Sequence, residues 1–148
     1  MTRSEMITAI ENAKSIHQAQ MHKIELVIAG DEVENPTAIT KTDCECGIWF
    51  FENEKLFIEI LGLQLYKRLD EGHTKWHNDY ANIYNLFFKE EKKGIFSKIF
   101  SFSDDKEMIA DKAKLYYEEL KVDTEELFKI TDSALRRVGA LSSSKFSS

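Results

Sequence analysis

Two histidines four residues apart are the first sign of chemistry in this 148-residue chain. His73 and His77 fall in a stretch with helical periodicity, where a spacing of four places both imidazoles on one face, one turn apart. Two imidazoles placed in this way can reach a single cation, as the histidines of zinc sites do. The pair alone is weak support for a metal, because a partly buried histidine is often satisfied by a hydrogen bond.

A third histidine joins the pair when the chain is projected as helices, at about 100° per residue. His17 falls in the middle of an apolar stripe on the first predicted helix, and His73 and His77 fall on the stripe of another. His22 lies about 140° off the first stripe, on the polar face, and we exclude it from the site. Burying imidazoles without partners costs roughly 1–3 kcal/mol each, so a shared metal ion explains three inward histidines together.

Cys44 adds a thiolate to the three imidazoles. This donor set suits tetrahedral zinc, whereas magnesium and calcium prefer oxygen ligands. The plainer interpretation of a single cysteine is a small buried hydrophobe. Cys46 is a competing thiol, but on a helix it would point away from Cys44, and we interpret it as core filler. Two cysteines separated by one residue do not make a disulfide framework.

Apolar residues recur every three or four positions through most of the chain, and the only proline is Pro36. The pattern predicts helices rather than strands. The predicted helices cover residues 4–29, 44–51, 55–61, 63–89 and 106–138. Ser4 is the predicted N-cap of the first helix, Gly30 its stop, and Gly62 the stop of the third.

The predicted fold is all-α: an antiparallel four-helix-type bundle with a short extra helix that carries the cysteine ligand. Amphipathic helices of this length bury their apolar faces only against each other. One domain is expected over residues 1–141, with 90–105 as a linker and 142–148 as a disordered tail. The aromatic segment 95–102 is either a cap over the end of the bundle or an exposed partner surface, and we favour the cap.

Several of these residues resemble a known family, the bacterial chemoreceptor zinc-binding (CZB) domain. The run from Cys44 to Trp49 is similar to that family's C-x-x-G-x-W signature. The family's later pattern of an aromatic, a leucine and H-x-x-x-H is matched by Tyr66, Leu69, His73, Trp76 and His77. His17 stands about as far before the cysteine as the family's first ligand does, and the likeness covers roughly residues 10–87.

The resemblance implies a zinc ion held by His17, Cys44, His73 and His77. It also implies a homodimer, and a chemotaxis or cyclic-di-GMP signalling partner, because such domains are attached to chemoreceptor signalling regions or diguanylate cyclases. We expect either that this partner is a separate protein or that the module acts alone, since 148 residues leave no room for a signalling hairpin or a catalytic domain. Where the family commonly has a large apolar residue, this chain has Cys46.

Four further residues have expected roles beside the metal. Gly47 is expected to permit close helix approach, and Trp49 to cover the site and exclude water. Thr124 and Asp123 are candidates for hydrogen bonds to a liganding imidazole, although contacts to solvent or backbone are the plainer interpretation.

A metal with four protein ligands has no open position for an activated water, so we expect a sensor rather than an enzyme. The signal is either zinc itself or an oxidant, such as hypochlorous acid, that attacks the Cys44 thiolate. The main alternative is a scaffold protein in which zinc has only a structural role and stabilises the fold. A hemerythrin-like di-iron protein is disfavoured, because two irons need bridging carboxylates and more histidines than the three inward ones.

The composition restricts partners and location. A formal net charge of -6 argues against a nucleic-acid or anionic-membrane surface, since both require clustered Lys and Arg. The chain has no apolar run of about 18 residues and no apolar leader at its start, so we expect a cytoplasmic protein without a membrane partner.

Overall fold

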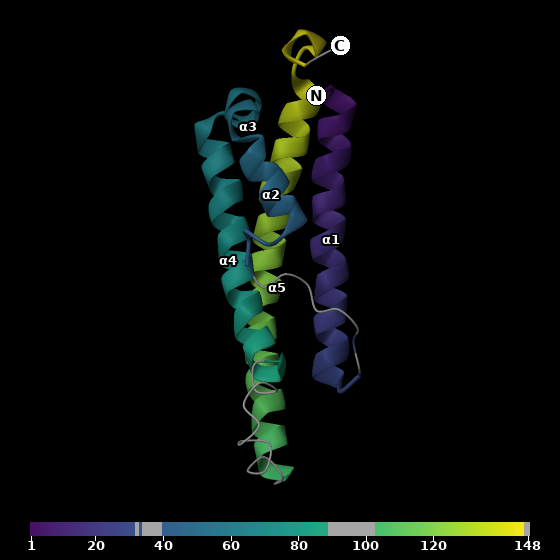
Figure 1. Ribbon diagram of the computed structural model, residues 1–148, viewed down its shortest axis with the longest axis vertical. Coiled ribbons are helices and arrows are strands. Elements are labelled where there is room, and N and C mark those ends of the chain that lie inside the picture. Colours follow the sequence, from purple (N-terminus) through teal and green to yellow (C-terminus); the bar gives the residue numbers. More distant parts are fainter. Residues whose placement is uncertain (32, 34–39, 89–102, 147–148) are drawn as a thin grey trace.

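A computed structural model describes residues 1–31, 33, 40–88 and 103–146, and helices dominate them (Figure 1). In chain order the elements are α1 (Arg3–Ala29), α2 (Glu45–Glu52), α3 (Glu54–Leu61), α4 (Leu63–Phe88), α5 (Ser103–Ala140) and a 3-10 helix (Ser143–Lys145). No strand occurs among the described residues, which confirms the all-α prediction. No described helix is long and apolar enough to cross a membrane.

The three long helices stand side by side, and α5 packs against both α1 and α4 (Figure 1). α1 and α4 run in one direction and α5 runs in the other. The short helices α2 and α3 lie toward the end of the molecule at which α1 begins and α5 ends. Since α3 packs against α4 and α5, the two short helices belong to the same bundle as the long ones.

The ends of α1 show why the helix occupies this stretch. Its N-cap is Thr2, so the prediction of Ser4 was wrong. The Glu5 N–H donates to the Thr2 hydroxyl at 3.2 Å, and the Thr2 N–H donates to the Glu5 carboxylate at 2.7 Å, which completes a capping box. Gly30 ends the helix as predicted, with a left-handed φ of 92°.

The core consists of two clusters of buried side chains. The first is built from Met6, Ile10, Phe57, Ile60, Leu61, Tyr66, Ala134 and Val138. The second is built from Met21, Ile24, Trp76, Tyr80, Ile83, Leu120 and Leu127. Along α1, His17 falls between Ile10 of the first cluster and Met21 of the second, and its side chain is only 3% exposed. The histidines predicted to face inward therefore lie inside the apolar core.

α5 begins at Ser103, earlier than the predicted start at residue 106. The last residues assigned to the linker, 103–105, are therefore helical. Residues 89–102 lie outside the described part of the chain, and with them the rest of the predicted linker and the aromatic segment 95–102.

Residues 142–146, expected to belong to a disordered tail, contain a 3-10 helix (Ser143–Lys145). The Ser142 hydroxyl caps it by accepting from the Ser144 N–H at 3.3 Å. The Arg3 guanidinium lies over the Phe146 ring, 5.5 Å from its centre. This end of the chain therefore contacts the start of α1.

Candidate metal centre

His17 brings one imidazole into the centre from the middle of α1. Its Nδ1 lies 2.7 Å from the Ala13 carbonyl oxygen, one turn earlier in the helix. A carbonyl only accepts, so Nδ1 carries the proton and Nε2 keeps a free lone pair. Nε2 is buried and has no hydrogen-bond partner among the described residues. The local helix therefore aims an unsatisfied metal-binding atom into the core.

His73 and His77 supply two more imidazoles from adjacent turns of α4. Their Nε2 atoms lie 3.1 Å apart, and their ring centres 4.7 Å apart. The His17 ring centre is 4.9 Å from that of His73 and 5.8 Å from that of His77. Burial lowers the pKa of His73, which favours the neutral ring that binds metals. Sequence periodicity selected these three histidines, and the structure brings all three together.

Cys44 reaches the centre from the residue that precedes α2. It is the N-cap of α2, with extended backbone angles of φ -77° and ψ 125°. The sequence had instead predicted that the helix includes Cys44. The Ile48 N–H donates to the Cys44 carbonyl at 2.9 Å, which starts the helix. The Cys44 side chain is buried against the imidazoles and only 4% of the residue is exposed.

One ligand atom each from His17, Cys44, His73 and His77 lies within 4.8 Å of the other three. Around tetrahedral zinc, metal–nitrogen bonds of about 2.0–2.1 Å and a metal–sulfur bond of about 2.3 Å put neighbouring ligand atoms roughly 3.3–3.6 Å apart. The pair on α4 is already close to this spacing, and movements on the order of 1 Å would bring in the others. The four residues therefore fit a tetrahedral metal ion.

No family model, curated protein or solved structure matches the chain. Leaving a buried nitrogen such as Nε2 of His17 without a partner costs about 1–3 kcal/mol. A metal ion would satisfy that nitrogen and would accept the lone pairs of both imidazoles on α4.

Gly47 lets the loop before α2 pass close to the centre. A Cβ on residue 47 would collide with the Lys41 carbonyl oxygen and lie 3.2 Å from Cε1 of His73. The close approach predicted for this glycine therefore exists, but its partner is loop backbone and not a helix. The Lys41 ammonium also donates to the Asp70 carboxylate on α4 at 2.7 Å, which helps to hold the loop that delivers Cys44.

Cys46 lies against the Cys44 sulfur, and our interpretation of it as core filler was incomplete. The two side chains were expected to diverge as on a helix, but Cys44 has extended backbone, so that projection does not apply. The pKa of the Cys44 thiol is lowered, chiefly by a hydrogen bond from Cys46, with the surrounding imidazoles acting in the same direction. That contact and burial raise the pKa of Cys46. Cys44 is therefore the thiolate of the pair.

Trp76 encloses the imidazoles from within the second core cluster. Its ring centre lies 4.6 Å from that of His17 and 5.0 Å from that of His77, and only 1% of the residue is exposed. The indole N–H donates to the Thr124 hydroxyl at 2.9 Å, and that hydroxyl donates to the Leu120 carbonyl at 2.6 Å. Thr124 thus fixes an aromatic wall of the centre, a role that the sequence did not reveal.

Asp123 and Trp49 have different neighbours from those expected. The buried Asp123 carboxylate accepts a hydrogen bond from the Lys75 ammonium. The Trp49 ring packs edge-on against Phe57, with 4.9 Å between ring centres. Trp49 also lines a cavity beside the histidines, so it borders the centre, while Trp76 packs edge-on against its imidazoles.

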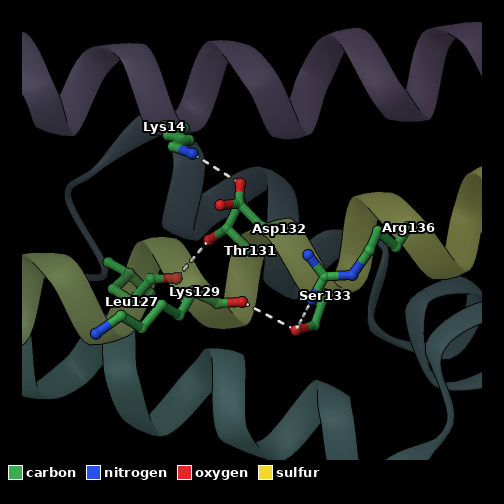
Figure 2. Close-up of polar contacts among 7 residues, drawn as sticks. All are labelled: Lys14, Leu127, Lys129, Thr131, Asp132, Ser133 and Arg136. Carbon is green, nitrogen blue, oxygen red and sulfur yellow. Dashed lines mark hydrogen bonds and ion pairs between the residues drawn. The ribbon is translucent and has the colours of Figure 1, made fainter.

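An apolar cavity of about 60 Å³ adjoins the centre. Its walls include His17, His73, Cys46, Trp49, Phe50 and Phe57. Lys14 also lines the cavity, and its ammonium donates from α1 to the Asp132 carboxylate on α5 at 2.7 Å (Figure 2). The Thr131 hydroxyl, also on the cavity wall, is turned to the Leu127 carbonyl at 2.8 Å (Figure 2). The space is thus lined mainly by carbon, with one thiol and two imidazoles in its wall.

Proposed function

We propose that the chain is a zinc-binding regulatory module in which His17, Cys44, His73 and His77 hold one zinc ion. The observation that carries this proposal is the convergence of four buried donor atoms within 4.8 Å of one another. Three imidazole nitrogens and one thiolate favour zinc over the oxygen-seeking cations magnesium and calcium. Apolar residues on both sides of the cluster keep water from competing for these donors.

The kind of regulation is proposed from the resemblance to CZB domains. Cys44, Gly47 and Trp49 occupy the positions of the C-x-x-G-x-W signature, and His73 and His77 those of the H-x-x-x-H pattern. By this likeness the module acts in the bacterial cytoplasm as a homodimer. Its signalling partner is then a chemoreceptor or a diguanylate cyclase.

Regulation, and not catalysis, follows from the number of protein donors. Four protein ligands complete a tetrahedral shell, whereas catalytic zinc keeps one position for water or substrate. What such a centre can change is its occupancy or the oxidation state of Cys44. We therefore propose that the signal is either the zinc level or an oxidant.

Loss of the metal would act on helix packing. The donors come from α1, from the N-cap of α2 and from α4, while α1 and α4 contact α5 more extensively than they contact each other. A metal ion that joins these segments holds α1 and α4 in register across the core. Without it, the imidazoles are left as buried polar groups, and the surface presented to a partner changes.

Metal titration tests this proposal and separates it from the scaffold alternative. Protein freed of metal by a chelator is titrated with zinc while circular dichroism records helix content. A sensor is expected to stay helical without metal and to bind zinc near the free concentration in the cell. A scaffold protein in which zinc only stabilises the fold is expected to unfold without metal. A chain that binds no zinc at all would overturn both interpretations.

A further inference from the structure

The two cysteines of the chain lie side by side at the metal centre. The Cys46 side chain shares a cavity wall with His17 and His73, whose ring nitrogens cluster with the Cys44 sulfur, and it is within hydrogen-bonding reach of that sulfur. Residues two apart have Cα atoms at most roughly 7 Å from each other. Disulfides take Cα separations of about 4.4–6.8 Å, so this pair can be joined with a local adjustment of the backbone.

The cavity gives a small uncharged molecule a route to Cys46, the neighbour of the Cys44 sulfur. Cys46 forms part of its wall, together with His17 and His73, and its volume of about 60 Å³ accommodates molecules of the size of water or hydrogen peroxide. Its carbon-rich lining disfavours charged oxidants, because moving an ion into an apolar space is costly. Cys44 is only 4% exposed and is not part of the cavity wall, so a peroxide in the cavity reaches its sulfur past Cys46 and the two imidazoles.

We propose that Cys44 and Cys46 form an intramolecular disulfide when the centre meets a small neutral peroxide, and that this bond ejects the metal ion. The position of Cys46 turns the metal centre into a reversible thiol switch. Only the metal-release part of this inference rests on the proposed zinc site, since the disulfide forms between residues of the chain itself.

The chemistry needs two steps and one equivalent of hydrogen peroxide. The Cys44 thiolate attacks one peroxide oxygen, the O–O bond breaks, hydroxide leaves, and Cys44 becomes a sulfenic acid. The Cys46 sulfur then attacks the Cys44 sulfur, so that an S–S bond forms while the S–O bond breaks. The Cys46 proton and the departing hydroxyl group leave as water. Two electrons have passed from the sulfur pair to the peroxide.

Disulfide formation removes a ligand and disturbs the start of α2. Cys44 is the N-cap of that helix, and Cys46 lies in its first turn. A bond between their sulfurs turns the Cys44 side chain toward Cys46 and away from the imidazoles. His17, His73 and His77 are left as the remaining donors, and three imidazoles hold zinc less tightly than the full set. A thiol reductant restores the original ligand.

Mass spectrometry of the zinc-loaded full-length chain tests the inference. The protein is treated with one equivalent of hydrogen peroxide, free thiols are alkylated, and the chain is digested with trypsin. Cleavage after Lys41 and Lys55 yields a peptide, residues 42–55, that contains both cysteines. We expect this peptide to lose two hydrogen atoms and escape alkylation, while a colorimetric chelator detects the released zinc. Dithiothreitol should then restore zinc binding.

Two variants and a metal-free sample make the result decisive. Cys46→Ala and Cys46→Ser should instead gain oxygen at Cys44, and a second equivalent of peroxide should convert the sulfenic acid to sulfinic acid, from which dithiothreitol cannot restore zinc binding. The inference is overturned if wild-type protein gains oxygen like the variants, links two chains together, or leaves both thiols free. Metal-free wild-type protein receives the same treatment, so the disulfide is decided even if the chain binds no zinc.

Discussion

The Nε2 atoms of His73 and His77 face each other at 3.1 Å across one turn of α4. Two ring nitrogens at this distance need either a proton or a cation between them, because two lone pairs repel and so do two N–H groups. His17 and Cys44 approach the same point, so the arrangement offers more electron pairs than a single shared proton can satisfy. This excess of donors makes metal content the first property to measure.

Purified wild-type protein is expected to carry one zinc ion per chain. Cys44→Ala should lose it, because three imidazoles without the thiolate form an incomplete shell. Cys46→Ala and His22→Ala should keep it, since Cys46 contacts the cluster without belonging to it and His22 is exposed, 3.4 Å from Glu25. Elemental analysis of the purified variants measures this directly. Full zinc content in Cys44→Ala would exclude Cys44 as a ligand.

The hydrogen bond between Trp76 and Thr124 yields a prediction about stability. Thr124→Val keeps the shape of the side chain but leaves the buried indole N–H without its acceptor, which costs about 1–3 kcal/mol of unfolding free energy. We also expect weaker zinc binding, because the Trp76 ring packs on His17 and His77. Urea unfolding and competition with a zinc-binding dye measure the two effects.

Thr131→Val is the matched control for that substitution. Thr131 is also a buried threonine of α5 whose hydroxyl donates to the carbonyl one turn earlier, at Leu127, but it receives no indole N–H. The carbonyl keeps its helical partner, so the loss should be smaller than for Thr124→Val, less than about 1.5 kcal/mol. Equal losses in the two variants would show that the indole contact contributes nothing.

The sequence predicted the long helices and the three inward histidines because helical periodicity is a local property. Each stripe recurs every three or four residues, and a histidine in such a stripe must face the core if the helix forms. His17, His73 and His77 are accordingly 3%, 6% and 3% exposed. No knowledge of which helix packs on which was needed for this inference.

The remaining features depend on cap geometry and distant contacts, which periodicity does not encode. Cysteine is not among the preferred N-caps, so nothing in the sequence placed Cys44 before α2. The prediction that the Cys46 side chain points away from Cys44 was wrong for the same reason, since it assumed that Cys44 is helical. The Trp76–Thr124 contact joins residues 48 positions apart, and only the packing of α4 on α5 brings them together.

A contact between α1 and α5 predicts a dependence of stability on pH. The Tyr117 hydroxyl donates to the Glu25 carboxylate, and this bond is the main cause that lowers the pKa of Glu25, with His22 assisting. A lowered folded pKa means that the stabilisation is present above the pKa of an unfolded glutamate, about 4.3, and is lost as the pH falls through the folded value. Tyr117→Phe should therefore reduce stability at pH 7 but not at pH 3.

The expected reduction is less than about 1 kcal/mol, because Glu25 is half exposed and screened by water. Tyr116→Phe is the control, since the Tyr116 hydroxyl makes no hydrogen bond within the described residues. Urea unfolding from pH 3 to pH 8 compares the free energies of unfolding of the two variants. Both variants keep the same metal centre, so any loss of metal in acid affects them equally. A difference between the variants that does not change with pH would contradict the assignment to Glu25.

The closeness of Gly47 to the loop predicts that a single methyl group there weakens zinc binding. In Gly47→Ala, the new Cβ collides with the Lys41 carbonyl and crowds Cε1 of His73, so either the loop that ends at Cys44 or the imidazole must move. We expect zinc affinity to fall about 10- to 100-fold, as when the support around a metal ligand is lost. Crowding should also cost about 1–3 kcal/mol of stability.

Gly139→Ala is the control, because it adds the same methyl group to α5 at a position where no neighbouring atom lies within 4 Å. It should leave zinc affinity unchanged while raising stability by up to about 1 kcal/mol. Calorimetric zinc titration compares the two variants, and equal affinities would mean that Gly47 does not hold the loop against the centre.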